Sequence, residues 1–321
     1  MTMDTDLGGA MGLKIFDHRR IDKAEIAQLV ILYNIFSRKE SSRLIFQGGT
    51  ALRWCYGGTR FSEDLDFVTS FAMTDSMVFI DRLRSAISND FILHFGPGEC
   101  STRWKERGGK GACHGFIEYR PVGSREKIAI KIELEQLKPD QLPDRNQLVF
   151  GALPAVSYLM QRGRLRLPPY GSIIQVETPE EILSDKVRAL LERPYIKGRD
   201  FHDLAFLVRT LGLKAENRLI QRKLDLYEAP FRPCRTVDHY LGLDKLGEAA
   251  RSELAGTLEQ DLARFVPGGD LIALKHQHFS QMVTAVVAVF QDIERNGGLD
   301  LSGYQGTSKA TVRDRNGIQK T

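Results

Sequence analysis

One stretch of the sequence, residues 44–69 (LIFQGGTALRWCYGGTRFSEDLDFVT), constrains the fold more than any other. It opens with the apolar run Leu44–Phe46, typical of a strand, and continues through Gly48–Thr50 into a short helical stretch at 51–56. Two more glycines mark a turn. Asp64–Asp66 then alternates acidic and apolar residues, so both aspartates lie on one face of a second strand. This order predicts a phosphate-binding turn that faces a metal site.

The two aspartates indicate a divalent cation. Carboxylates a few ångströms apart repel each other and raise the pKa of one of them unless a cation neutralises the pair. Mg²⁺ takes oxygen ligands, keeps some of its waters and bridges to substrate phosphates. Such ions stabilise the attacking and leaving oxygens when a phosphoryl or nucleotidyl group is displaced. We therefore expect Asp64 and Asp66 to bind Mg²⁺ or Mn²⁺.

The glycine turn indicates an anion. A helix N-terminus presents free amide N–H groups, and glycine lets a phosphate approach the backbone. The hydroxyl of Thr50, together with Arg60 and Ser62, could contact further phosphate oxygens. We expect Gly48, Gly49 and these three residues to bind a nucleoside triphosphate (NTP). A Gly-Gly pair alone is most often an ordinary turn and a D-x-D alone is common on surfaces, so the prediction rests on their combination.

Composition sets only broad limits. Apolar residues make up 42% and charged residues 27% of the chain, which is typical of a soluble globular protein. A net charge of +4 permits a polyanionic partner without requiring one. The N-terminus lacks the apolar segment of a signal peptide, no run of roughly 18 apolar residues occurs, and the four cysteines are scattered. We expect a cytoplasmic protein with no membrane partner.

Periodicity divides the chain into two halves. An α+β domain is expected at 13–176 and a helical domain at 177–300, followed by a disordered tail at 301–321. The expected fold class is therefore α+β, a mixed sheet with flanking helices plus a C-terminal helical domain. Helices are expected at 21–39, 75–88, 178–192, 200–211, 215–228, 243–264 and 270–296, strands at 91–95, 115–120, 127–135 and 172–176, a basic loop at 99–115 and an irregular connection at 136–171.

Two segments resemble a known family. QGGTALRWCYGGTRFSEDLDFV resembles the AbiEii/AbiGii toxin family of the polymerase β-like nucleotidyltransferase superfamily, in which GGTAL and RFSEDLDF recur. Downstream, EEILSDKVRALLERPYIKGRDFHDLAFLV resembles later motifs of that family, D-K-x-x-A-L and R-D-x-x-D-L. The frame of both motifs covers roughly 21–210. Gly49 stands where many superfamily members carry Ser, so Thr50 would have to supply any hydroxyl contact.

The resemblance implies roles for particular residues. Asp64 and Asp66 would bind the catalytic metal, and Gly48–Thr50 would hold the NTP. Lys186 would contact phosphate, and Asp203 would be a further essential acid. Structural alternatives remain open for the last two, because Lys186 could be a surface lysine and Asp203 could form a salt bridge to Lys186 or Arg193. Asp200, at the start of the same helix as Asp203, is placed to cap it.

The resemblance also implies a function. The chain would be the toxin of a bacterial toxin–antitoxin or phage abortive-infection system that transfers NMP from an NTP to an acceptor hydroxyl. The acceptor would be RNA, such as the 3′ end of tRNA, and the cognate antitoxin would be a separate protein. Two alternatives remain: a non-catalytic nucleotide-binding protein that works through a partner, and a small-molecule adenylyltransferase of the antibiotic-modifying kind.

The resemblance also implies a third carboxylate on a neighbouring strand, which many enzymes of this fold use as the base for the attacking hydroxyl. Glu133 is the first choice, because it lies on the polar face of the strictly alternating strand KIAIKIELE. Glu118 and Glu135 are weaker candidates, and a solvated sheet face with ion pairs is the structural alternative.

The loop at 99–115 interleaves basic residues with an aromatic one. This combination suits an RNA backbone with a stacked base, although an exposed basic loop without a ligand is the simpler explanation. The candidate RNA-binding residues are Arg103, Trp104, Lys105, Arg107 and Lys110.

Overall fold

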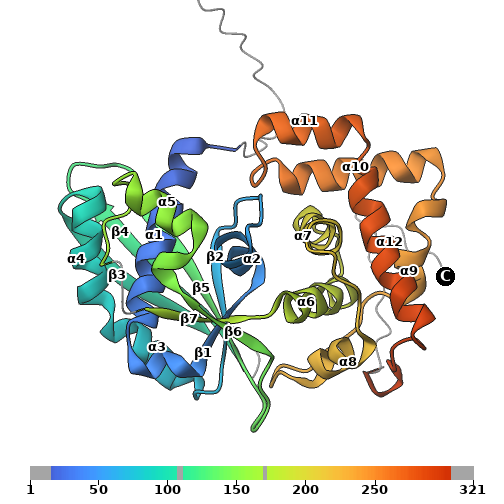
Figure 1. The fold of residues 1–321 in the computed structure, drawn as a ribbon, viewed down its shortest axis with the longest axis horizontal. Helices are drawn as coiled ribbons and strands as arrows, with labels where there is room; N and C mark the ends of the chain where they lie inside the picture. Colours follow the sequence, from blue (N-terminus) through green and yellow to red (C-terminus); the bar gives the residue numbers. More distant parts are fainter. Residues whose placement is uncertain (1–15, 107–110, 169–171, 305–321) are drawn as a thin grey trace, which may run out of the picture.

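A seven-stranded mixed sheet forms the centre of the protein, in the order β3-β4-β5-β2-β1-β7-β6 (Figure 1). The computed structural model describes residues 16–106, 111–168 and 172–304. None of the helices in these ranges has the length and apolar character needed to cross a membrane. The strands are β1 (Leu44–Gln47), β2 (Asp64–Thr69), β3 (Gly98–Glu106), β4 (Ala112–Pro121), β5 (Ile128–Gln136), β6 (Arg145–Val149) and β7 (Ile173–Glu177).

Helices pack against the sheet and form most of the second half of the described chain. Short 3₁₀ turns lie at Lys39–Arg43, Phe150–Ala152, Leu243–Lys245 and Ser302–Tyr304. The α-helices are α1 (His18–Phe36), α2 (Gly48–Tyr56), α3 (Met73–Arg82), α4 (Arg84–Phe95), α5 (Pro154–Gln161), α6 (Pro179–Glu192), α7 (Gly198–Arg209), α8 (Asn217–Asp225), α9 (Val237–Leu241), α10 (Glu248–Leu262), α11 (Gly268–His276) and α12 (Ser280–Arg295).

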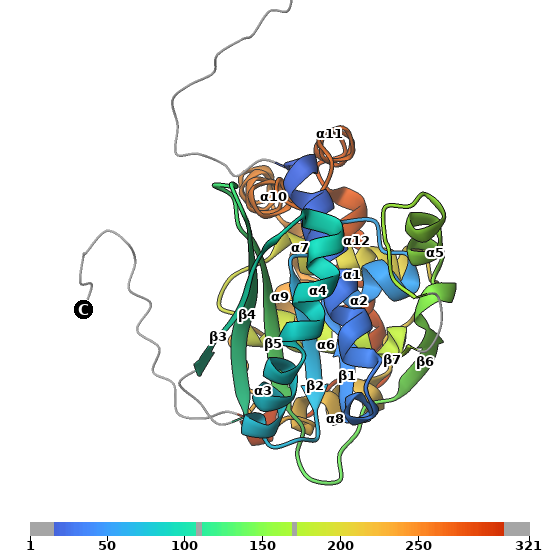
Figure 2. The same cartoon turned by 90° about the vertical axis from the view of Figure 1, so that its left-hand side faces the viewer.

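The two faces of the sheet differ in chemistry. Phe46, Phe67 and Ile132 lie on the apolar face, are buried, and belong to a core that α1 and α4 cover (Figure 2). Alternation along the same strands turns Asp66 and Glu133 to the opposite face. There α6 contacts α2. The polar residues are thus held on a rigid central sheet.

The helical half packs onto the same core. Helix α7 contacts α6, α10 and α12, and one continuous cluster of buried apolar residues contains both Phe67 of the sheet and Phe290 of α12. The α+β class is confirmed, as are strands at 115–120, 127–135 and 172–176. The start of α6 follows the expected chemistry, because the Thr178 hydroxyl accepts a hydrogen bond from the Glu181 amide and Pro179 is the first helical residue.

The expected strand at 91–95 is wrong, because these residues end α4. Ile87 and Phe91 lie four residues apart and are both buried, whereas Ile92 and Leu93 are exposed. The run FILHF therefore follows helical spacing, although its bulky apolar residues suggested a strand.

The expected loop at 99–115 is also wrong where the structure describes it. Strand β3 pairs with β4 along its whole length and forms an edge of the sheet. Charged residues such as Arg103 and Lys105 are common on edge strands, where they discourage pairing with other chains. This is why the segment had the composition of a loop. Arg107 and Lys110, like the expected tail from residue 305 onward, lie outside the described residues.

Four further segments differ from expectation. The segment 136–171 contains β6 and α5. The expected helix at 75–88 is divided between α3 and α4, and the one at 243–264 becomes α10 only from Glu248. The expected helix at 270–296 is two helices, α11 and α12, because His278 and Phe279 adopt positive φ angles of 48° and 53°.

Candidate active site

The glycine turn lies against the acidic strand. Gly48 has a φ of +78°, and a Cβ built on it would stand 2.5 Å from Oδ2 of Asp66. A Cβ on Gly49 would collide with the guanidinium group of Arg60. Gln47 precedes α2 and makes no side-chain capping hydrogen bond, which leaves the first amide N–H groups of this helix without a partner from the capping side chain. Only glycines allow this close approach.

Asp64 and Asp66 lie beside two charged residues of β5. In the parallel pairing, Asp64 stands opposite Lys131 and Asp66 opposite Glu133. Burial, and then the charges of Glu133 and Asp64, raise the pKa of Asp66 well above its usual value. The Lys131 ammonium contacts Glu133 and lies 3.9 Å from Asp64 Oδ2. The carboxylates therefore concentrate negative charge that a cation would relieve.

These carboxylates fit a magnesium ion. Within the described parts of the chain, no three His, Cys, Asp or Glu side chains are grouped so that they alone could hold an ion. Mg²⁺ does not need such a group, because it commonly binds one or two carboxylates together with waters and substrate phosphates. Asp64 and Asp66 would provide such hard oxygen ligands next to the glycine turn.

Thr50 and Ser62 lie at the junction of the turn and the strand. The Thr50 hydroxyl is buried and donates a hydrogen bond to the backbone carbonyl of Asp64. Ser62 is buried as well, and its hydroxyl oxygen would lie 3.1 Å from a Cβ on Gly49. The Ser62 carbonyl accepts a hydrogen bond of 2.7 Å from Gln28 of α1. Both residues fix the position of β2 relative to the turn.

Arg60 connects the turn to the helical half. Its Nε and Nη2 atoms each donate a 2.6 Å hydrogen bond to the carboxylate of Asp203 on α7. Lys186 of α6 lies 2.6 Å from the same carboxylate and 3.0 Å from that of Asp200, which Arg193 also contacts. Although burial opposes ionisation, Arg60 and Lys186 lower the pKa of Asp203 to about 2. The structural alternative for Asp203, a salt bridge to Lys186, is therefore present.

Asp200 does not cap α7, contrary to expectation. The N-cap position is Lys197, whose side chain makes no capping hydrogen bond, and Asp200 lies in the first turn with its carboxylate paired to Lys186 and Arg193. A cap requires a short polar side chain just before the helix, whereas here the carboxylate turns inward to two cations.

The alternative third carboxylates lie farther from the aspartates. Glu118 of β4 pairs with Arg103 at 3.3 Å and Lys127 at 2.9 Å. Glu135 stands opposite Val68, one alternation past Glu133, and its Oε2 lies 3.4 Å from Gln47 Nε2. Glu133, directly opposite Asp66, is the one that the sheet brings to the pair.

The proposed RNA-binding residues of β3 are separated from the aspartates by two strands, β4 and β5. Trp104 Nε1 donates a 2.9 Å hydrogen bond to Asp81 of α3, and the Arg103 guanidinium lies 5.4 Å from the centre of the Phe116 ring. Lys105 stands opposite His114. These side chains are thus partly engaged within the sheet.

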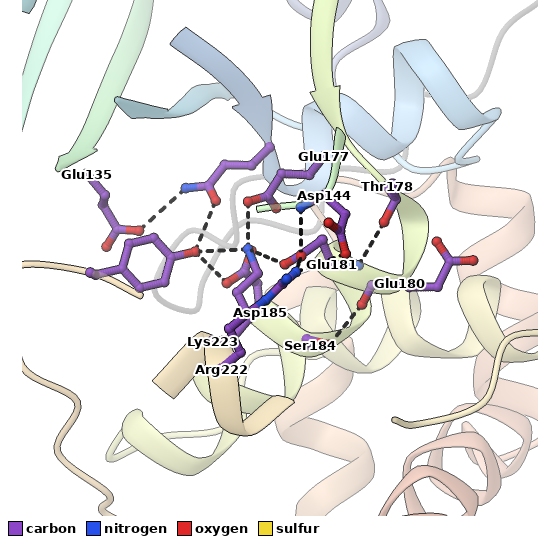
Figure 3. Close-up of polar contacts among 12 residues, drawn as sticks. Glu135, Asp144, Glu177, Thr178, Glu180, Glu181, Ser184, Asp185, Arg222 and Lys223 are labelled. Carbon is purple, nitrogen blue, oxygen red and sulfur yellow. Dashed lines mark hydrogen bonds and ion pairs between the residues drawn. The ribbon is translucent and has the colours of Figure 1, made fainter. Parts of the chain in front are cut away.

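Sequence reasoning missed a buried polar network behind the turn (Figure 3). Lys223 of α8 is fully buried and contacts Glu177 at 2.6 Å, Asp185 at 2.8 Å and Glu181 at 3.1 Å. Burial, then the neighbouring Asp185, raises the pKa of Glu177 well above its usual value. The only sequence signal is a lysine on the apolar side of an amphipathic helix, which does not reveal its partners.

The same network reaches the glycine turn. The Tyr227 hydroxyl donates a 2.6 Å hydrogen bond to Asp185 and lies 3.4 Å from Oε1 of Gln47, the residue just before Gly48. The guanidinium of Arg188 lies 4.3 Å from the centre of the Tyr227 ring. Helices α6 and α8 therefore support the end of β1 from behind.

Comparisons with known proteins agree with this architecture. The family model described as nucleotidyl transferase AbiEii toxin of type IV toxin–antitoxin systems matches residues 30–287. No curated protein matches the chain. The crystal structure of JHP933 from Helicobacter pylori has a TM-score of 0.51 at 16% identity, covering 88% of this chain and 96% of that one. A second H. pylori structure, described as a nucleotidyltransferase, has a TM-score of 0.50 at 17% identity, covering 88% and 99%.

At these identities the two structures show a shared fold, whereas the family match extends over most of the chain. It includes the glycine turn, the acidic strand, and both helices that carry Lys186 and Asp203. The protein belongs to the AbiEii family of nucleotidyltransferase toxins.

Proposed function

We propose that the protein is a Mg²⁺-dependent toxin that transfers NMP from an NTP to a hydroxyl group of RNA, such as the 3′ end of a tRNA. One observation carries this proposal: the positive-φ turn at Gly48 meets the carboxylate of Asp66, with space for no side chain between them. A phosphate bound at the first amides of α2 would lie beside the metal ligands.

Asp64 and Asp66 would hold Mg²⁺ or Mn²⁺, which neutralises triphosphate charge when bound. The amides at Gly48 and Gly49 would bind phosphate oxygens. Lys186 supports this binding, because an ammonium group has three donors and Asp200 and Asp203 account for two. Arg60 and Thr50, whose polar groups are bound within the protein, would position the turn, and Ser62 faces it.

Glu133 would act as the base. The acceptor oxygen attacks the α-phosphorus, its proton passes to Glu133, and the bond to the bridging oxygen breaks so that pyrophosphate leaves. Lys131, which contacts Glu133, would hold that carboxylate in position.

The biological setting follows from the family. We propose that a separate antitoxin protein controls this toxin in the cytoplasm, where both NTPs and RNA are present. A small-molecule adenylyltransferase would instead label a compound of low mass, and a non-catalytic nucleotide-binding protein would label nothing.

The test incubates the full-length protein with each α-³²P NTP, Mg²⁺ and total RNA. The wild type should label RNA, and excess EDTA should prevent the labelling. Asp64→Ala should reduce it by more than about 10³-fold, because a metal ligand supplies several kcal/mol of transition-state stabilisation.

Asp75→Asn, which removes an exposed carboxylate on α3, is the matched control and should label RNA normally. An Asp64→Ala protein that remains toxic to cells and still labels RNA would contradict the proposal. Label on a small molecule, or on nothing, would favour the corresponding alternative.

A further inference from the structure

We propose that the acceptor RNA strand reaches Asp64 through a basic groove formed by α1, β5, the segment after α5 and the turn between α10 and α11. This inference rests on the proposed function and assigns the second substrate to a surface of its own.

The groove is a cavity of about 1720 Å³ at the end of the sheet where β2 and β5 begin. Residues from segments far apart in the chain line it, among them Arg19, Lys131, Arg166 and Arg264. Sites for small ligands usually occupy about 300–1,000 Å³. The groove is therefore larger than a small-molecule acceptor requires and suits several nucleotides.

Basic residues outnumber acidic residues along the groove. Nine lysines and arginines line the groove, against five aspartates and glutamates. Three of these cations, Lys127, Lys131 and Arg199, contact carboxylates that do not line the groove, so the excess available to a ligand comes mainly from the other basic residues. A local excess of this kind attracts a phosphate backbone by releasing its counterions.

The groove reaches Asp64 without including the residues proposed to bind the NTP. Of the ten residues assigned to metal, nucleotide and catalysis, only Asp64 lines it, and neither Gly48 nor Lys186 does. An NTP held at the glycine turn would thus leave the groove open. The two substrates would meet at Asp64, as in-line transfer requires.

Several cations in the groove are available to phosphate. Arg19 and Arg166 are exposed, and neither forms a salt bridge with a carboxylate of the described residues. Arg20 and Arg264 share one carboxylate, Glu63, at 2.6 Å and 3.0 Å, which leaves that trio with a net positive charge. Because Glu63 directly precedes Asp64, this trio lies at the inner end of the groove.

An acidic protein segment could also be attracted by such charge. A groove that ends on a catalytic carboxylate is better explained by a strand whose terminal hydroxyl must react. We therefore propose that RNA occupies the groove. A groove that binds an acidic protein and no RNA would overturn this proposal.

The test compares three full-length double variants. Arg19→Glu/Arg166→Glu reverses charge in the groove, and Arg103→Glu/Lys105→Glu reverses it on β3. Lys39→Glu/Lys245→Glu makes the same change at exposed residues that do not line the groove. Fluorescence anisotropy measures the binding of labelled tRNA without NTP over a range of salt concentrations, and a separate titration measures the binding of NTP with Mg²⁺.

The groove variant should bind tRNA at least about tenfold more weakly and with a salt slope lower by at least ~1. Its NTP binding should be unchanged, and the Lys39/Lys245 control should match the wild type throughout. Wild-type tRNA affinity in the groove variant would overturn the inference, as would a loss confined to the β3 variant or a wild type that does not bind tRNA. Because this readout needs no turnover, it stays separate from failure of the proposed reaction.

Discussion

Gly48 and Asp66 illustrate what single residues contribute to this site. Their close approach was predictable because the turn and the carboxylates occupy one short stretch, whereas their roles in binding nucleotide and metal remain predictions. Arg60 was different: its partner Asp203 lies 143 residues away, so the sequence suggested a phosphate ligand where the structure has a buried ion pair. Local chemistry can be predicted from local sequence, whereas long-range pairing cannot.

Substitution of Gly48 by alanine should abolish activity. The new Cβ would stand 2.5 Å from Asp66 Oδ2, and displacement of a metal ligand by about 1 Å can cost ~10²-fold in rate. Gly57→Ala is the matched control, because Gly57 has a similar φ of +80° and open space around its Cβ. Both variants should lose about 1–2 kcal/mol of stability from backbone strain. Initial rates of RNA labelling separate them, and equal activity in the two would show that the contact is unimportant.

His202 should make the protein less stable in mild acid. Its Nδ1 is buried without a hydrogen-bond partner, and burial lowers its pKa to about 4 from 6.5. The unfolded chain therefore takes up this proton first, so stability falls as pH drops from 6.5 to 4, by at most ~1.4 kcal/mol per pH unit. Carboxyl groups with raised pKa values, such as Glu177, act in the opposite direction.

The contribution of His202 is therefore measured by comparing the pH dependence of stability between the wild type and its variants. Urea unfolding across this pH range should show a smaller acid loss in His202→Gln than in the wild type, while exposed His276→Gln should leave the pH dependence unchanged. Parallel pH profiles for all three proteins would refute this role of His202.

At the scale of elements, α6, α7 and α8 hold the glycine turn in place. Arg60 connects the segment before β2 to α7, and Tyr227 connects the end of β1 to α6. The start of α6 was predictable from Thr178 and Pro179, because capping depends on adjacent residues. Strand β3 was not, because an edge strand with exposed charges has the composition of a loop until its pairing partner is known.

Lys223→Met should destabilise the whole protein. Removal of the buried ammonium leaves Glu177, Glu181 and Asp185 without their shared cation, and breaking such a pair typically costs about 3–5 kcal/mol. Lys214→Met, at an exposed position, should change stability by no more than about 0.5 kcal/mol. Equilibrium urea unfolding provides the measurement, and equal midpoints for the two variants would contradict a structural role for the network.

At the scale of the whole molecule, the sheet and the helical half share one hydrophobic core. The α+β class was predictable from the change of periodicity along the chain. The basic groove was not, because α1, β5 and the α10–α11 turn meet only in the folded protein. The domain boundaries at 176 and 300 remain predictions, and limited proteolysis of the full chain would locate them.

The central claim is nucleotidyl transfer at the Asp64–Asp66 site, and the position of the transferred label tests it most directly. Parallel reactions contain the same NTP labelled with ³²P at either the α or the γ position, together with Mg²⁺ and RNA. The wild type should transfer the α label to RNA and release the γ label as pyrophosphate, and Asp66→Asn should do neither. Transfer of the γ label to RNA, or α-label transfer by Asp66→Asn at the wild-type rate, would contradict the claim.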